Sequence, residues 1–337
     1  HIFRVPVDKA APVALTSGSS IEWTPVAAGD DRVAFVSTGA KAAPRVAIAR
    51  TDGGRSETLE AIPDDFPQAQ LITPEPVTFK ASDGTRVHGQ LFSPPAGNVS
   101  RPAIVFVHGG PPRQMLLGWH YMGYYSNAYA VNQYLAAHGF VVLSVNYRLG
   151  IGYGRAFHQP DHWGPTGASE YLDVLAGAHF LQRTPGVDAK RIGIWGGSYG
   201  GYLTALALAR NSNIFKAGVD YHGLHDWSPF VDLWNGGKAA DRFEKGDRDA
   251  AMKTAFLSSP DASIAKWKSP VLLIVGDDDR NVPFAQTVDL ARRLDAQGVP
   301  YEELVLPNEI HGFLRHSSWL NADRANVDFL ERKLGGR

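Results

Sequence analysis

From about residue 77 onward, short apolar runs alternate with longer stretches of helical character. The apolar runs have the length of buried strands; they are Ala103–Val107, Phe140–Val145, Arg191–Trp195, Ala217–Tyr221, Val271–Val275 and Tyr301–Leu306. The helical stretches are Ser126–His138, Glu170–Arg183, Tyr199–Ala209, Phe284–Gln297 and Trp319–Lys333. This alternation predicts a doubly wound α/β fold, in which helices cover both faces of a mostly parallel sheet. Ligands of such sheets bind beyond the carboxyl ends of the strands, so functional residues are expected directly after each strand.

The first 75 residues follow a different pattern. Short β-prone runs separated by turn residues predict antiparallel strands at Ile2–Val7, Val33–Ser37 and Arg45–Arg50. The segment Pro63–Pro76 contains four prolines and resembles a stiff linker. We therefore expect two domains, a β-rich segment with its linker at 1–75 and an α/β domain at 76–337, the latter opening with a hairpin of Val77–Lys80 and Arg86–Phe92.

Composition excludes several classes of protein. The formal net charge is −1 with both signs interspersed, which argues against a nucleic-acid partner. No apolar run approaches the roughly 20 residues of a membrane span. The chain has no cysteine, which excludes a thiolate nucleophile and a Cys-containing zinc site and is compatible with either bacterial cytoplasm or periplasm. Because the sequence opens on His1 without a signal-peptide pattern, we expect that its natural start has been removed.

Ser198 is the candidate nucleophile. The segment 196–201 reads Gly-Gly-Ser-Tyr-Gly-Gly and lies between a predicted strand and a predicted helix, which is the context of a G-x-S-x-G nucleophile elbow. Small flanking residues let the sharp turn project the hydroxyl above the sheet, and the helix N-terminus favours a developing oxyanion. The bare pattern also arises by chance in a Gly-rich chain, but the strand before it and the helix after it favour the nucleophile.

Candidates for the acid and the base follow the serine in the order that α/β-hydrolases use. Three aspartates at 277–279 come directly after a buried strand, where a carboxylate can accept a hydrogen bond from an imidazole. The alternatives are a solvated loop or an acidic metal site. A metal site would need further ligands from other loops, and we find no such set in the sequence. His311 lies between the last predicted strand and the last helix and is the candidate base, with His316 as its rival.

An oxyanion hole is expected after the first strand of the α/β region. Ala103–Val107 leads into His108, Gly109 and Gly110, a glycine turn whose backbone N–H groups can point at a carbonyl oxygen. The second donor would be the N–H of Tyr199, which follows the nucleophile. Without the elbow, the same residues would be read as an ordinary Gly-Pro turn.

Five motifs together resemble the catalytic domain of the prolyl oligopeptidase family of serine peptidases, over about residues 75–335. They are His108-Gly109-Gly110-Pro111, Asn146-Tyr147-Arg148 with Gly152-Tyr153-Gly154, the segment 196–202, the segment 276–282, and His311-Gly312. The His-Gly-Gly-Pro form is most similar to the acylaminoacyl-peptidase and bacterial dipeptidyl-peptidase-like branches. The resemblance implies an α/β-hydrolase fold and a cofactor-independent, metal-independent peptidase.

The resemblance also implies roles for particular residues. The family pattern G-x-x-D-x-x-V selects Asp279 as the triad acid, and Asn281 matches a residue that binds the substrate carbonyl. Relatives that use a tyrosine side chain in the oxyanion hole carry it where this chain has His108, which favours backbone donors at Gly109 or Gly110. The aromatic S1 pocket of the family corresponds to Trp227, Phe230 and Trp234, completed by Tyr199 and Val282, and would accept proline or another apolar P1 side chain. For these aromatic residues, ordinary core packing is the alternative.

Family members carry a β-propeller before the hydrolase domain. About 75 residues are too few for a propeller, because each blade needs about 40 residues. We therefore expect the N-terminal strands to be the remnant of a β-propeller and the chain to be the C-terminal portion of a longer protein, with the rest of the propeller as its partner.

The sequence thus predicts a serine exo- or oligopeptidase that cleaves short peptides through Ser198, Asp279 and His311 and an acyl-enzyme. A carboxylesterase on the same fold is the alternative within this chemistry, and a non-catalytic binding module is the alternative outside it. Neither the preferred substrate nor the state of assembly, monomer or homo-oligomer, is fixed by the sequence.

Overall fold

The computed structural model describes residues 1–8, 11–95, 97, 99–235 and 248–335. Contacts divide the chain into two compact units, one of residues 1–75 with 116–137 and one of 76–115 with 138–337. Within the described part, no helix is both long and apolar enough to span a bilayer.

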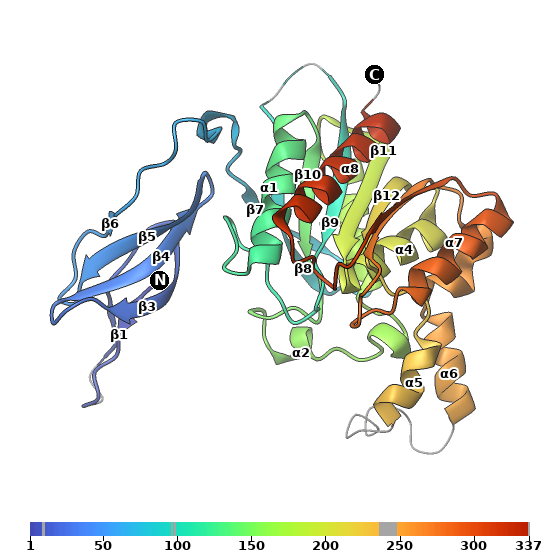
Figure 1. The fold of residues 1–337 in the computed structure, drawn as a ribbon, viewed down its shortest axis with the longest axis horizontal. Helices are drawn as coiled ribbons and strands as arrows, with labels where there is room; N and C mark the ends of the chain where they lie inside the picture. The colour runs from blue at the N-terminus through green and yellow to red at the C-terminus, as the bar shows by residue number, and fades with distance from the viewer. Residues whose placement is uncertain (9–10, 96, 98, 236–247, 336–337) are drawn as a thin grey trace. The chain divides into compact units, whose positions relative to one another are not determined.

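The first unit is built on antiparallel strands (Figure 1). A four-stranded sheet has the order β3-β4-β5-β6, and a separate pair joins β1 to β2; the bounds are Phe3–Arg4 (β1), Val13–Ala14 (β2), Ile21–Ala27 (β3), Arg32–Gly39 (β4), Ala42–Arg50 (β5) and Glu57–Thr58 (β6). The predicted runs correspond to β1, β4 and β5, whereas β3 and the two-residue strands β2 and β6 were missed. Pro25 interrupts the pattern of β3, and its pairing register shifts between Trp23 and Val26.

A helix from later in the chain completes this unit. In α1 (Gly123–Ala137), the Tyr129 hydroxyl donates to the Ala40 carbonyl at 2.8 Å, and the Gln133 amide exchanges hydrogen bonds with both backbone groups of Ile72 at 2.7 and 2.8 Å. Four strands in a meander match one blade of a propeller in number. That these strands belong to a propeller stays a prediction.

The second unit is an eight-stranded sheet of order β14-β13-β12-β11-β9-β10-β8-β7. Its strands are Glu75–Lys80 (β7), Arg86–Phe92 (β8), Arg101–Val107 (β9), Val141–Asn146 (β10), Val187–Gly197 (β11), Phe215–Tyr221 (β12), Val271–Gly276 (β13) and Tyr301–Leu306 (β14). Six neighbouring strands are parallel to one another, namely β14, β13, β12, β11, β9 and β10. Strand β8 pairs antiparallel with β10. The expected α/β fold with a mostly parallel sheet is confirmed.

Helices cover both faces of this sheet. The longer ones are Tyr171–Arg183 (α3), Tyr199–Asn211 (α4), Ala285–Gln297 (α7) and His316–Leu334 (α8), close to the predicted bounds. In Figure 1, α8 lies in front of the strands and α4 behind them. Strands β10 and β13 are buried at every residue, which is why they read as continuous apolar runs. The parallel strands all end at one edge of the sheet, where His108, Ser198, His222, Asp279 and His311 lie just beyond them.

Three short helices were not predicted. They are Arg155–His158 (α2), Ser228–Asn235 (α5) and Arg248–Leu257 (α6), and they occupy the two long connections that follow β10 and β12. Each is too short for the apolar periodicity of a helix to stand out from its surroundings. Two 3₁₀ segments, η2 (Gly164–Thr166) and η4 (Pro260–Lys266), lie in the same connections.

Candidate active site

Ser198 lies on a sharp turn between β11 and α4. Its backbone has φ 60° and ψ −119°, a conformation that residues other than glycine seldom adopt. A side chain at Gly196 or at Gly200 would collide with the Val107 carbonyl oxygen, because β9 passes directly against the turn. The glycines on either side are therefore needed for close approach, as the elbow motif requires.

His311 joins the serine to a buried carboxylate. Its Nε2 atom is 2.9 Å from the Ser198 hydroxyl oxygen, and its Nδ1 atom is 2.7 Å from Oδ2 of Asp279. The Asp279 side chain has no exposed surface, and its other oxygen accepts the backbone N–H groups of Asn281 and Val282, each at 2.9 Å. Both carboxylate oxygens are thus fixed, which holds the imidazole in one orientation.

The neighbouring candidates lie elsewhere. Asp277 accepts the Asn308 N–H at 2.6 Å, and Asp278 forms an exposed ion pair with Arg280. His316 is exposed at the first residue of α8. Of the three aspartates and the two histidines that the sequence offered, the structure brings Asp279 and His311 to Ser198.

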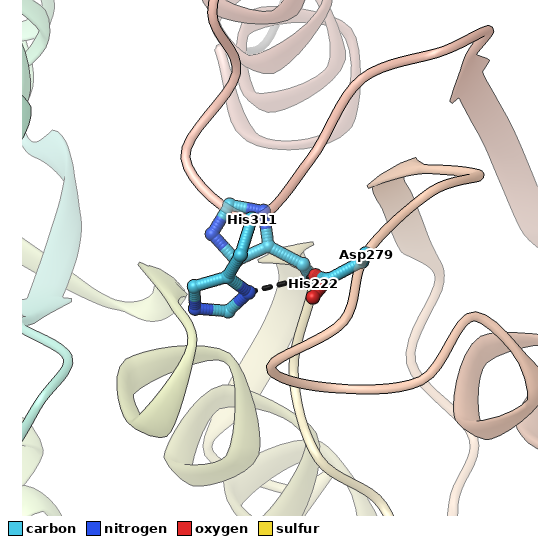
Figure 2. Close-up of side chains that lie close together, drawn as sticks. All are labelled: His222, Asp279 and His311. Carbon is cyan, nitrogen blue, oxygen red and sulfur yellow. Dashed lines mark hydrogen bonds and ion pairs between the residues drawn. The ribbon is translucent and has the colours of Figure 1, made fainter.

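His222, just beyond β12, is a neighbour of this group that sequence reasoning missed. Its ring centroid is 4.3 Å from that of His311, and Figure 2 shows the two imidazoles side by side with the Asp279 carboxylate at their edge. Burial, reinforced by the adjacent His311, holds the pKa of His222 well below its ordinary value, so its ring is neutral. The only signal in the sequence was its position after a strand end.

His222, Asp279 and His311 offer ligand atoms within 4.8 Å of one another, the one such group among the described residues. A cation there would have to displace the 2.7 Å hydrogen bond between Asp279 and His311. Two imidazoles and a carboxylate suit a zinc ion in kind. The hydrogen bond between His311 and Asp279 fits an acid–base pair better, because it already occupies Nδ1 of His311 and Oδ2 of Asp279, two atoms that would be ligands of a metal ion.

Two of the predicted oxyanion donors, Gly109 and Tyr199, lie next to the serine. A Cβ atom at Gly109 would collide with the Gly197 carbonyl and come within 3.0 Å of the Ser198 Cβ, so the glycine turn approaches the nucleophile closely. Gly110 has φ +55° and lies next to the Arg113 guanidinium. Tyr199 is the first residue of α4, where a backbone N–H has no partner within the helix.

The surroundings of the His108 side chain are not those of a donor to the oxyanion. Its ring is fully buried and stacks on Tyr147 with centroids 4.3 Å apart, while the Tyr147 hydroxyl donates to the His108 carbonyl at 2.6 Å. The ring therefore forms part of the packing below the turn.

A cavity of about 1290 Å³ opens beside the elbow. Its walls combine aromatic residues and prolines, namely Pro111, Pro112, Pro160, Trp163, Pro165, Tyr199 and Trp227. The residues His158, Asp161 and His162 add polar groups to the wall. Sequence reasoning anticipated Tyr199 and Trp227 here but missed the wall at 158–166, which comes from the irregular connection after β10.

The other predicted pocket residues have different surroundings. Phe230 packs its ring on Trp227 at 6.1 Å and is not among the residues that line the cavity. Val282 is buried beside Asp279, and Asn281 is exposed on the same loop. The side chain of Trp234 lies outside the described part of the structure.

Comparisons with known proteins agree with this architecture. Residues 126–337 match the prolyl oligopeptidase family. The chain is 30% identical over 276 residues to the uncharacterized peptidase YuxL of Bacillus subtilis, covering 78% of this chain and 39% of that protein. It is 27% identical to dipeptidyl aminopeptidase BIII of Pseudoxanthomonas mexicana, covering 91% of this chain and 45% of that protein. It thus spans less than half the length of these two relatives.

Solved structures show the same likeness. A puromycin-hydrolyzing peptidase of Mycobacterium tuberculosis superposes with a TM-score of 0.82 at 27% identity, covering 98% of this chain and 50% of that one. The fold therefore belongs to the α/β-hydrolase class. Within that class the chain is a member of the prolyl oligopeptidase family of serine peptidases, as its five motifs led us to expect.

Proposed function

We propose that this chain carries the catalytic machinery of a serine peptidase that acts on short peptides, with Ser198 as nucleophile, His311 as general base and Asp279 as the orienting acid. The hydrogen-bonded series from the Ser198 hydroxyl through His311 to the buried Asp279 carboxylate carries the proposal. Membership in a family of serine peptidases supports it.

In the first half of the reaction, the Ser198 hydroxyl oxygen attacks the scissile carbonyl carbon while Nε2 of His311 takes its proton. Asp279 accepts the Nδ1 hydrogen and stabilises the imidazolium that forms. Backbone N–H groups of Tyr199 and of Gly109 or Gly110 stabilise the oxyanion. His311 then gives its proton to the leaving amine, and the acyl group stays on Ser198.

In the second half, His311 takes a proton from water, whose oxygen attacks the acyl-enzyme, and returns it to Ser198 as the carboxylic acid leaves. The cavity beside the elbow would hold the P1 side chain. Its aromatic and proline walls favour an apolar residue, including proline, and Tyr199 and Trp227 are the proposed contacts. Phe230 would hold the Trp227 ring in place by packing against it, and Asn281 would bind the substrate carbonyl.

A fluorophosphonate probe tests the nucleophile. The wild-type protein should be labelled on Ser198 and should release p-nitroaniline from peptide anilides, and Ser198→Ala should do neither. Labelling or peptide hydrolysis that survives in Ser198→Ala would refute the assignment. Cleavage of matched p-nitrophenyl esters without any cleavage of the anilides would refute the peptidase and leave an esterase.

A further inference from the structure

A buried carboxylate lies behind the cavity wall and takes no part in the proposed chemistry. Glu170 has no exposed surface and directly precedes α3. One of its oxygens accepts the Tyr199 hydroxyl at 2.7 Å, and both accept the backbone N–H of Gly164, at 3.1 and 3.2 Å. Among the described residues, no lysine or arginine forms an ion pair with it. A buried carboxylate without a cation is costly, so its hydrogen bonds must hold it in place.

The two groups that Glu170 binds belong to two adjoining parts of the cavity wall. Tyr199 lines the cavity, and its backbone N–H is a proposed oxyanion donor. Gly164 begins the turn of η2, whose neighbours Trp163 and Pro165 line the cavity. Gly164 and Tyr199 are 35 residues apart in sequence, and Glu170 binds both of them.

The contact between these two parts of the wall is tight. Gly164 has φ +45°, and a Cβ atom on it would come within 2.8 Å of the Tyr199 hydroxyl oxygen. A larger residue at this position would strain the backbone and displace the Tyr199 hydroxyl, and the carboxylate binds both partners there. Burial raises the pKa of Glu170, while the Tyr199 hydroxyl and the Gly164 N–H favour its ionised form.

We propose that Glu170 is a specificity-determining positioning residue, which sets the width of the P1 cavity by binding the Gly164 turn to the Tyr199 side chain. This inference rests on the proposed function, because it takes the cavity as the P1 site. A large apolar P1 side chain would use the whole wall, whereas alanine would reach little of it. Loosening the wall should therefore weaken selection for large apolar P1 residues.

The test compares two peptide anilides that differ only in having phenylalanine or alanine at P1. The measured quantity is the ratio of their kcat/KM values, in which the fraction of correctly folded enzyme cancels. Glu170→Gln keeps the shape of the side chain but turns an NH₂ group toward the Tyr199 hydroxyl or the Gly164 N–H, both of which are donors. Tyr199→Phe removes the hydrogen bond between Tyr199 and Glu170 by deleting its donor. Each variant should lower the phenylalanine-to-alanine ratio about tenfold, mainly through KM for the larger substrate.

The double variant gives a second, independent readout. If the two residues act through their shared hydrogen bond, Glu170→Gln with Tyr199→Phe should lower the ratio little further than either change alone. Glu22→Gln is the matched control, because Glu22 is also buried and hydrogen-bonded, to Thr16, in the other unit; it should leave the ratio unchanged. Should Glu170→Gln not fold, Tyr199→Phe still tests the ratio.

A ratio that stays constant in the Glu170 and Tyr199 variants, or changes that add in the double variant, would overturn the inference. The proposed function fails separately, because it predicts fluorophosphonate labelling of Ser198 in the wild type. Labelling with a constant ratio would thus refute the role of Glu170 alone.

Discussion

At the scale of single residues, strain and close packing locate the nucleophile. The conformation of Ser198 costs on the order of 1–3 kcal/mol, which the surrounding structure must offset. Part of that support is visible: the Ser198 N–H donates to the Tyr221 carbonyl at 2.8 Å, and its carbonyl accepts the Tyr202 N–H at 2.9 Å. The backbone therefore fixes the hydroxyl at the sheet edge before any substrate binds.

Asp279→Asn tests the orienting acid. An amide would still accept the N–H groups of Asn281 and Val282 through its oxygen, but its NH₂ group would face His311 and favour the wrong tautomer. We expect kcat to fall roughly 10³- to 10⁴-fold with an unchanged circular dichroism spectrum. Asp278→Asn is the control, since its carboxylate forms only an exposed ion pair with Arg280, and it should change kcat less than about twofold. Equal effects of the two substitutions would contradict the assignment.

At the scale of elements, the loop between β14 and α8 shows how His311 is held. The Glu309 carboxylate, which is buried, accepts the Leu314 N–H at 2.6 Å, the Arg315 side chain at 2.8 Å and the Ser318 hydroxyl at 2.6 Å. Its backbone carbonyl accepts the N–H of Asp278 at 3.1 Å. Glu309 thus connects the loop that carries His311 with the loop that carries Asp279.

We expect Glu309→Gln to lower kcat roughly ten- to hundredfold, because a small displacement of His311 would misalign proton transfer. Glu302→Gln is the control on β14; its exposed pair with Arg332 should contribute little. The measurement is kcat per active site, with hydrogen exchange of residues 307–315 to report the loosened loop. A wild-type kcat in Glu309→Gln would show that the loop holds its shape without the carboxylate.

The same carboxylate predicts an acid limit for the loop. Burial opposes ionisation of Glu309, but the hydrogen bonds from Ser318, Leu314 and Arg315 outweigh it and lower its pKa to about 2. A lowered folded-state pKa stabilises the loop above the unfolded value near 4.5, and this contribution is lost as the pH falls toward 2. Exchange of the loop amides should therefore rise below about pH 4.5 in the wild type more than in Glu309→Gln, measured relative to β13.

At the scale of the whole molecule, strong periodic signals made the α/β unit predictable. Its predicted strands and longer helices lie within a few residues of their observed bounds, because buried parallel strands give continuous apolar runs and α4 is buried at most positions. The order of motifs at the strand ends then indicated Ser198, His311 and one of the three aspartates at 277–279, and the family pattern selected Asp279 among these. The association of α1 with the N-terminal strands was not predictable, since it depends on side-chain contacts such as that of Tyr129 with Ala40, between β4 and β5.

The cavity was harder to anticipate for a physical reason. Glu170 looked like the start of a helix, and nothing local shows that its carboxylate is buried against Tyr199. His222 follows a strand like many structural histidines. The wall at 158–166 has no regular periodicity, and two of its residues, His162 and Gly164, have positive φ. Such residues are defined by tertiary partners, which periodicity does not report.

The stability of the second unit should depend on one buried acid. Asp261 in η4 is buried, neither of its carboxylate oxygens accepts a hydrogen bond from the described residues, and Arg293 is 3.2 Å away. Burial raises its pKa to about 6, although His225 and Arg293 oppose this shift. Because the folded-state value lies above the unfolded one near 3.8, ionisation destabilises the fold, and stability is lost as the pH rises from about 4 through 6.

Asp261→Asn should therefore increase the free energy of unfolding at pH 8, by up to on the order of 2–3 kcal/mol, and by clearly less at pH 5. Arg293 keeps Asp289 as a partner at 2.7 Å, so the substitution leaves no unpaired cation. Urea unfolding of the two proteins at both pH values measures the difference. Asp289→Asn, at a half-buried position in the same cluster, should change stability little and equally at both pH values. A gain in Asp261→Asn that is independent of pH would mean that packing, not the buried charge, limits stability at this site.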